Sequence, residues 1–120
     1  MTVELRDSDF LDHICEAIAK ISRYTAGKDE ASFMNDELIQ DGVIRNLEII
    51  GEAVTKLSVA LKSKYSDVPW GEIAGMRNRL IHGYMAVNME IIWGTVEKVV
   101  PAFFLRVMEI QRDLDQQKAP

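Results

Sequence analysis

Residues 36–65 read DELIQDGVIRNLEIIGEAVTKLSVALKSKY, and this stretch sets the fold class of the chain. Its apolar side chains recur at steps of three and four residues, which is the period of a helix with one buried face. They are Val43, Ile44, Leu47, Ile50, Val54, Leu57 and Leu61. The pattern predicts one long helix from about Asp36 to Tyr65, with a length of about 40 Å.

Gly51 lies inside this predicted helix, where a glycine costs about 1 kcal/mol relative to alanine. An interior glycine often marks a close approach between two helices. We therefore expect a neighbouring backbone to pack beside Glu52.

The rest of the chain also has helical periodicity, without strand-like alternation or hairpin dipeptides. Gly27 suits a left-handed helix end, Asn88 suits a helix N-cap, and Pro101 should kink or split the last helix. The expected elements are a helix from about Ser8 to Thr25, a short turn at Asp29–Met34, a helix from about Pro69 to His82, and a last helix from Asn88 whose polar end frays from about Gln111. This pattern predicts an all-α, antiparallel up-and-down bundle of four main helices plus a short helix.

Length and composition indicate one folded domain over residues 1–120, with 48% apolar and 28% charged residues. The lone Cys15 excludes an intrachain disulfide and suits a reducing compartment, and its helical neighbours indicate an inert apolar role. The sequence has no membrane-length apolar run and no secretory signal at its N-terminus. We therefore expect a cytoplasmic protein.

Charge is distributed unevenly along the chain, whose net charge is −5. Residues 1–52 carry −7, residues 53–88 carry +3 and residues 89–120 carry −1. The overall acidity argues against a general nucleic-acid coat protein. The positive part of the chain could still receive an anionic ligand.

The positive part contains the sequence RNRLIHGY at residues 77–84, in which Arg77 and His82 form an Arg-x4-His pair. Asn78 and His82 are four residues apart and share a helix face, so the Asn78 amide can orient the imidazole. Arg77 and His82 are separated by about 140° around the helix axis. Arg77 must therefore reach around the helix, or a second chain must bring another copy of the pair alongside.

Two such copies facing one cleft could cleave RNA without a metal. A histidine would take the proton of a ribose 2′-OH, arginine would stabilise the charge on the phosphate, and a histidine would protonate the leaving 5′ oxygen. Apolar residues outside the main stripes, namely Trp93, Val100 and Phe104, suggest a second buried surface, for which a homodimer is a simple explanation.

Structural interpretations are also open for these residues, and on the spacing alone they are favoured. Arg77 and His82 could be solvated charges that interact with the helix dipole. A structural role is likewise expected for Arg79 as a surface or interface charge, for Tyr84 as a packing residue and for His13 as an exposed side chain. Glu52 or Glu48 could pair with Arg77 or Arg79 across the bundle, or could be ordinary surface acids. The sequence has no metal-ligand cluster and no glycine-rich phosphate loop.

Three segments together resemble the HepT-like family of the HEPN superfamily, the toxin half of prokaryotic HepT/MntA toxin–antitoxin systems. They are VIRNLEIIGEA at residues 43–53, VPW at residues 68–70 and MRNRLIHGY at residues 76–84. The resemblance covers about the whole chain and implies an all-α homodimer with a composite ribonuclease site. It assigns catalysis to Arg77 and His82, with Asn78 in support.

The resemblance also implies a regulatory site at Tyr84. In the family, a cognate minimal nucleotidyltransferase antitoxin of the MntA type transfers adenylyl groups from ATP to this phenol and silences the toxin. The chain itself is then expected to need no cofactor, because the partner uses the ATP.

Two other functions remain possible from the sequence. The chain could be a non-enzymatic helical subunit that presents a nucleotide or substrate to a nucleotidyltransferase, with Arg77 binding a nucleotide phosphate. It could also be a purely structural bundle.

Overall fold

The computed structural model describes residues 6–82 and 88–118, with the side chains of Ile81, His82 and Lys118 left out. Over these residues the chain is helical, and no strand occurs in them. The elements are α1 (Asp7–Thr25), α2 (Glu30–Met34), α3 (Glu37–Lys56), α4 (Val59–Lys64), α5 (Trp70–His82), α6 (Met89–Gly94), the π-helical turn η2 (Thr95–Val99) and α7 (Val100–Lys118).

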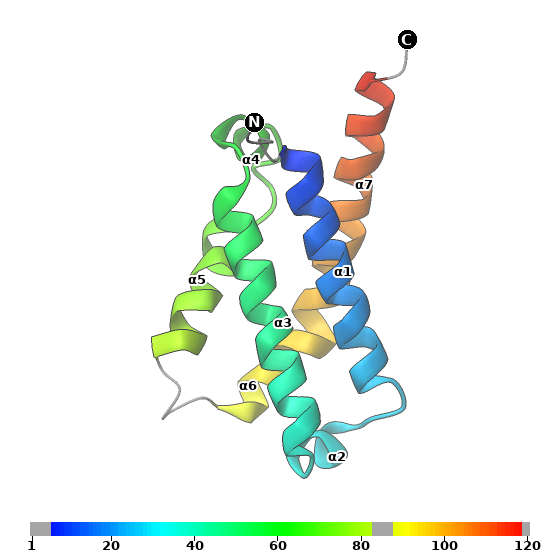
Figure 1. Ribbon diagram of the computed structural model, residues 1–120, viewed down its shortest axis with the longest axis vertical. Coiled ribbons are helices and arrows are strands. Elements are labelled where there is room, and N and C mark those ends of the chain that lie inside the picture. Colours follow the sequence, from blue (N-terminus) through cyan, green and yellow to red (C-terminus); the bar gives the residue numbers. More distant parts are fainter. Residues whose placement is uncertain (1–5, 83–87, 119–120) are drawn as a thin grey trace, which may run out of the picture.

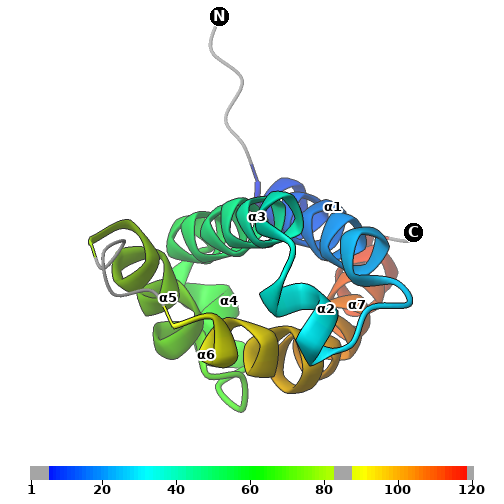
Figure 2. The same cartoon turned by 90° about the horizontal axis from the view of Figure 1, so that it is seen from below.

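The helices alternate in direction along the bundle (Figure 1). α1 packs against α3, α3 packs against α5, and α7 lies against α1. Viewed along the bundle, these helices and α6 form a ring around the core, and α2 closes one end (Figure 2). The predicted all-α antiparallel bundle is therefore confirmed.

The core is made by one face of each long helix, as the periodicity predicted. Phe33 of α2 adds a plug at one end, where its ring contacts Trp93 at a centroid distance of 5.2 Å. The fully buried large side chains are Phe33, Leu11, Ile14, Ile21, Leu47, Ile50, Ile110, Val43, Val54 and Val107.

Local helix-end predictions are confirmed. Gly27 has a φ of 72°, so it adopts the left-handed conformation expected just past the end of α1. The Asn88 side chain accepts hydrogen bonds from the backbone N–H groups of Glu90 (2.8 Å) and Ile91 (3.3 Å), and it caps α6.

The prediction of one helix from Asp36 to Tyr65 is wrong, because the chain breaks after Lys56. Leu57 has an extended backbone, and the Ser58 hydroxyl caps α4 by accepting from the Leu61 N–H at 3.1 Å. The Asp7 carboxylate accepts hydrogen bonds from the Ser58 N–H (2.8 Å) and hydroxyl (2.6 Å). Leu57 and Leu61 remain buried on either side of the break, so the apolar pattern alone did not reveal it.

The last helix is interrupted close to Pro101, as expected. The interruption is the π-helical turn η2, which ends two residues before Pro101, so the helix changes its hydrogen-bond pattern just ahead of the residue that lacks an N–H. α7 is helical to Lys118, and the predicted fraying from Gln111 stays a prediction. Gln111 donates to Asp12 at 2.8 Å, and the Tyr65 hydroxyl donates to Asp113 at 3.0 Å.

The three apolar residues taken as a sign of a second surface belong to the monomer core. Trp93 and Val100 are buried, and Phe104 packs partly buried against the same core. Their position gives no support to a dimer. The exposed large hydrophobic side chains of the described residues are Leu38, Val59, Ile91, Val99, Leu105 and Met108.

In the part of the chain that the structure describes, no helix combines the length and the apolar character needed to cross a membrane.

Candidate active site

The site is built on α5, whose inner face is held by buried Ile73 and Leu80. Arg77 lies between them in sequence and is partly exposed, while Asn78 and Arg79 are exposed. The helix therefore anchors itself with apolar residues and presents these polar side chains at the surface.

Gly51 brings α3 and α5 unusually close at Arg77. A Cβ atom built on Gly51 would lie 2.8 Å from the Arg77 Cβ, 3.2 Å from the Arg77 backbone N and 3.3 Å from the Ile73 carbonyl oxygen. Two of these three neighbours are backbone atoms, which cannot move aside as a flexible side chain could. The predicted close approach beside Glu52 is confirmed.

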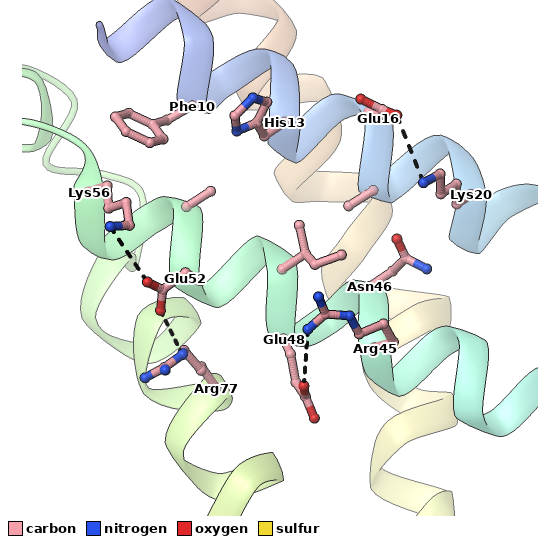
Figure 3. Close-up of a pocket in the computed structure, with 13 residues that line it drawn as sticks. Phe10, His13, Glu16, Lys20, Arg45, Asn46, Glu48, Glu52, Lys56 and Arg77 are labelled. Atoms are coloured by element: carbon pink, nitrogen blue, oxygen red, sulfur yellow. Dashed lines mark ion pairs between the residues drawn. The ribbon is translucent and has the colours of Figure 1, made fainter. Parts of the chain in front are cut away.

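Next to this contact, Glu52 and Arg77 form an ion pair between α3 and α5 (Figure 3). The Arg77 Nε atom lies 2.6 Å from a Glu52 carboxylate oxygen, and the two side chains are 39% and 43% exposed. Lys56 contacts the other Glu52 oxygen at 3.7 Å. The closest contact is made through Nε, which sets the direction of the guanidinium, and among the described residues no hydrogen bond is made by its two terminal nitrogens, which suit a second anion.

The other acidic and basic candidates do not join this pair. Glu48 contacts Arg45 of its own helix at 3.8 Å. Arg79 donates to the Glu72 carbonyl oxygen of α5 at 3.5 Å. The sequence left several pairings of Glu48 or Glu52 with Arg77 or Arg79 open. Among the described residues, the Glu52–Arg77 pair is formed.

His82 and Tyr84 are less fully placed. The backbone of His82 forms the last residue of α5, but its side chain lies outside the described part of the structure. Tyr84 lies among residues 83–87, which are outside it altogether. The Arg77–His82 and Asn78–His82 pairings therefore stay predictions.

A groove of about 550 Å³ extends from Arg77 across α3 to α1 (Figure 3). Its α1 wall carries Phe10, His13 and Lys20, spaced so that they share one helix face. The His13 ring meets the Phe10 ring edge to face, with centroids 6.0 Å apart and an interplanar angle of 89°.

Sequence reasoning treated His13 as an exposed residue without a partner. It is exposed, but it lines a groove shared with Arg77. The spacing of Phe10, His13, Ala17 and Lys20 was the available signal for this face.

Asn46 contributes a buried polar group to the same groove. It is 4% exposed and donates its side-chain N–H to the Gly42 carbonyl oxygen at 2.8 Å. Its side-chain oxygen has no hydrogen-bond donor among the described residues.

Cys15 lies away from this groove and is partly buried. Burial, followed by the nearby Asp12 carboxylate, raises the pKa of the thiol. Its Sγ donates to the Gln111 side-chain oxygen at 3.4 Å. Over residues 6–82 and 88–118, no group of three or more His, Cys, Asp or Glu side chains is placed to hold a metal ion.

Comparison with known proteins identifies the family. The family model described as "Ribonuclease HepT-like" matches residues 14–110. A "Putative RNase" of Caldanaerobacter subterraneus subsp. tengcongensis is 42% identical over 101 residues, covering 84% of this chain and 90% of that protein. A "Probable ribonuclease HepT" of Thermococcus cleftensis is 39% identical over 94 residues, covering 78% of this chain and 86% of that protein.

A longer relative is also similar. The "Gamma-glutamylcyclotransferase and putative RNase" of Methanocaldococcus jannaschii is 39% identical over 109 residues, which cover 91% of this chain but 49% of that protein. No solved structure gives a significant match. With a family match over most of its length and relatives of similar size, the chain belongs to the HepT-like ribonuclease family of the HEPN superfamily.

Proposed function

We propose that this protein is the toxin of a HepT/MntA-type (type VII) toxin–antitoxin system and a metal-independent endoribonuclease. The observation that carries the proposal is the position of Arg77. Its backbone is pressed against Gly51, and its guanidinium is directed by Glu52 on the helix that ends at His82. A held arginine that keeps two nitrogens for an incoming anion suits a phosphodiester.

In the proposed reaction, His82 accepts the proton of a ribose 2′-OH, and the 2′ oxygen attacks the adjacent phosphorus. Arg77 stabilises the added negative charge on the phosphate oxygens. The bond from phosphorus to the 5′ oxygen breaks, and a protonated histidine supplies that oxygen with its proton. The products are a 2′,3′-cyclic phosphate and a 5′-hydroxyl.

This scheme needs a base and an acid, and one copy of the chain contains one His82. We propose that a homodimer supplies the second histidine, with the two α5 helices facing one cleft. The angle of about 140° between Arg77 and His82 supports this arrangement, because the arginine of one copy can then work beside the histidine of the other.

We further propose that a cognate MntA-like nucleotidyltransferase uses ATP to adenylylate Tyr84. The modification would add bulk and negative charge two residues from His82. Both effects oppose binding of an RNA phosphate, which gives a physical reason for silencing.

The experiment compares purified wild type with Arg77→Ala, His82→Ala and Arg79→Ala on single-stranded RNA in the presence of EDTA. Arg79→Ala is the matched control, because it removes an exposed arginine from the same helix. We expect cleavage by wild type and Arg79→Ala, and a loss of about 100-fold or more for the other two variants.

Equal cleavage by His82→Ala and wild type would contradict the catalytic assignment. A wild type that binds ATP or the partner but never cleaves RNA would favour the non-enzymatic subunit instead. For the regulation, intact mass after co-expression with the nucleotidyltransferase should increase by adenylyl units in wild type and stay unchanged in Tyr84→Phe.

A further inference from the structure

The groove that starts at Arg77 has the dimensions and the floor of a ligand site. Its volume of about 550 Å³ lies within the range of small-molecule clefts. Ala17, Ile49 and Ala53 give it an apolar floor between α1 and α3. A strand whose phosphate sits at Arg77 can therefore continue into this groove.

The α1 wall offers a surface on which a base can stack. His13 is exposed, and its ring makes an edge-to-face contact with Phe10 on the wall. Single-stranded RNA is bound by stacking its bases on aromatic and histidine rings. Phe10, the other ring of this pair, is partly buried and packs against the core, so it anchors the stacking surface.

Cations line the groove in an otherwise acidic region. Lys20 and Arg45 stand at its edges, and each contacts a carboxylate of its own helix at 3.8 Å. Their side chains are 40% and 70% exposed, so these pairs are weak and a phosphate can displace the carboxylates. Lys56 and Arg77 also line the groove, so its lining contains four lysine or arginine side chains and three glutamate side chains.

The same lining argues against a protein as the occupant. Lysine and glutamate are depleted in the centres of protein–protein interfaces, whereas this groove carries Lys20, Lys56, Glu16, Glu48 and Glu52. Long charged side chains around an apolar floor are better suited to a charged strand with flat bases.

We infer that the groove between α1 and α3 binds the nucleotides of single-stranded RNA adjacent to the phosphate at Arg77, with His13 as a base-stacking residue and Lys20 and Arg45 as phosphate contacts. The inference rests on the proposed function, since it extends the substrate path of the same site.

The test measures binding and cleavage separately in the full chain. Binding uses a fluorescein-labelled, mixed-sequence oligonucleotide with 2′-O-methyl riboses, which the blocked 2′ oxygen protects from cleavage. The variants are His13→Ala, His13→Phe, Lys20→Ala and Arg45→Ala. Lys98→Ala is the matched control, because Lys98 is an exposed lysine on η2, outside the groove.

We expect His13→Ala to raise the Kd about tenfold, and His13→Phe to restore binding because it keeps a flat ring. Lys20→Ala and Arg45→Ala should each reduce the slope of log Kd against log salt by about 0.7, the value for one phosphate contact in a single strand. Lys98→Ala should change neither quantity.

Cleavage of unmodified RNA by the same proteins distinguishes the two proposals. If wild type cleaves RNA and all groove variants bind and cleave like wild type, the inference is overturned while the nuclease assignment stands. If wild type binds through the groove but never cleaves, the inference holds and the proposed function fails. A change of oligomeric state in the groove variants, measured by sedimentation, would show that a second copy covers the groove and would overturn the inference.

Discussion

Replacing Gly51 by alanine tests how tightly α3 and α5 are packed at Arg77. The added methyl group would lie 2.8 Å from the Arg77 Cβ and within 3.3 Å of two backbone atoms of α5. Overpacking of this kind costs about 1–3 kcal/mol. Alanine recovers about 1 kcal/mol of helix propensity in the interior of α3. The expected net result is a loss of up to about 2 kcal/mol in the free energy of unfolding, together with weaker cleavage as α5 is displaced from Glu52.

Gly75→Ala is the matched control, because Gly75 is also in the interior of a helix. A Cβ atom there would meet the end of the Arg79 side chain at 3.5 Å, which is an ordinary contact. Gly75→Ala should therefore gain about 1 kcal/mol from propensity alone. Urea unfolding followed by circular dichroism, at one fixed protein concentration, measures both variants. If Gly51→Ala is stabilised as much as Gly75→Ala, the reasoning about the close approach is refuted.

Three further predictions concern side chains with defined partners. Glu52→Gln should lower kcat/KM for RNA about tenfold by releasing the guanidinium, whereas Glu97→Gln, at an exposed glutamate of η2 outside the groove, should have little effect; equal values would remove Glu52 from the site. Cys15, whose pKa is raised by burial, should react more slowly with a thiol reagent at pH 8 in the folded protein than in urea, and equal rates would contradict its position. The pKa of Asp67 is lowered, first by its hydrogen bonds from Arg106, so the folded state binds this proton less readily than the unfolded chain. Its contribution to stability is thus present above the ordinary pKa of 3.8 and is lost as the pH falls below it; the acid-induced fall in the free energy of unfolding should be shallower in Asp67→Asn than in wild type.

Features fixed by neighbouring residues could be predicted from the sequence. The left-handed Gly27, the Asn88 cap and the interruption near Pro101 each depend on a few adjacent residues. The close approach at Gly51 could be predicted because close packing is the main structural reason for a glycine inside a strongly helical pattern. These local rules placed α5, and with it the backbone of the candidate site.

Features that depend on distant residues were missed. The break at Ser58 relies on the Asp7 carboxylate, which is 51 residues away in the sequence. The groove depends on how α1 lies against α3, because His13 gains significance only beside the residues of the other helix. The pairing of Glu52 with Arg77 could be named as one of several options, but choosing it required the rotation of α5 about its axis.

The π-helical turn η2 separates two registers of the last helix. Ile92 and Trp93 face the core before it, and Val100, Phe103 and Val107 face the core after it. In this turn the Val100 N–H donates to the Thr95 carbonyl oxygen, five residues back, whereas an α-helix would use the residue four back. The turn thus takes up one extra residue locally, and both halves of the helix keep their apolar side chains toward the core. Removing one residue from Thr95–Val99 should therefore let the turn close into ordinary α-helix without turning α7 away from α1, whereas adding a residue would exceed what one π-helical turn takes up.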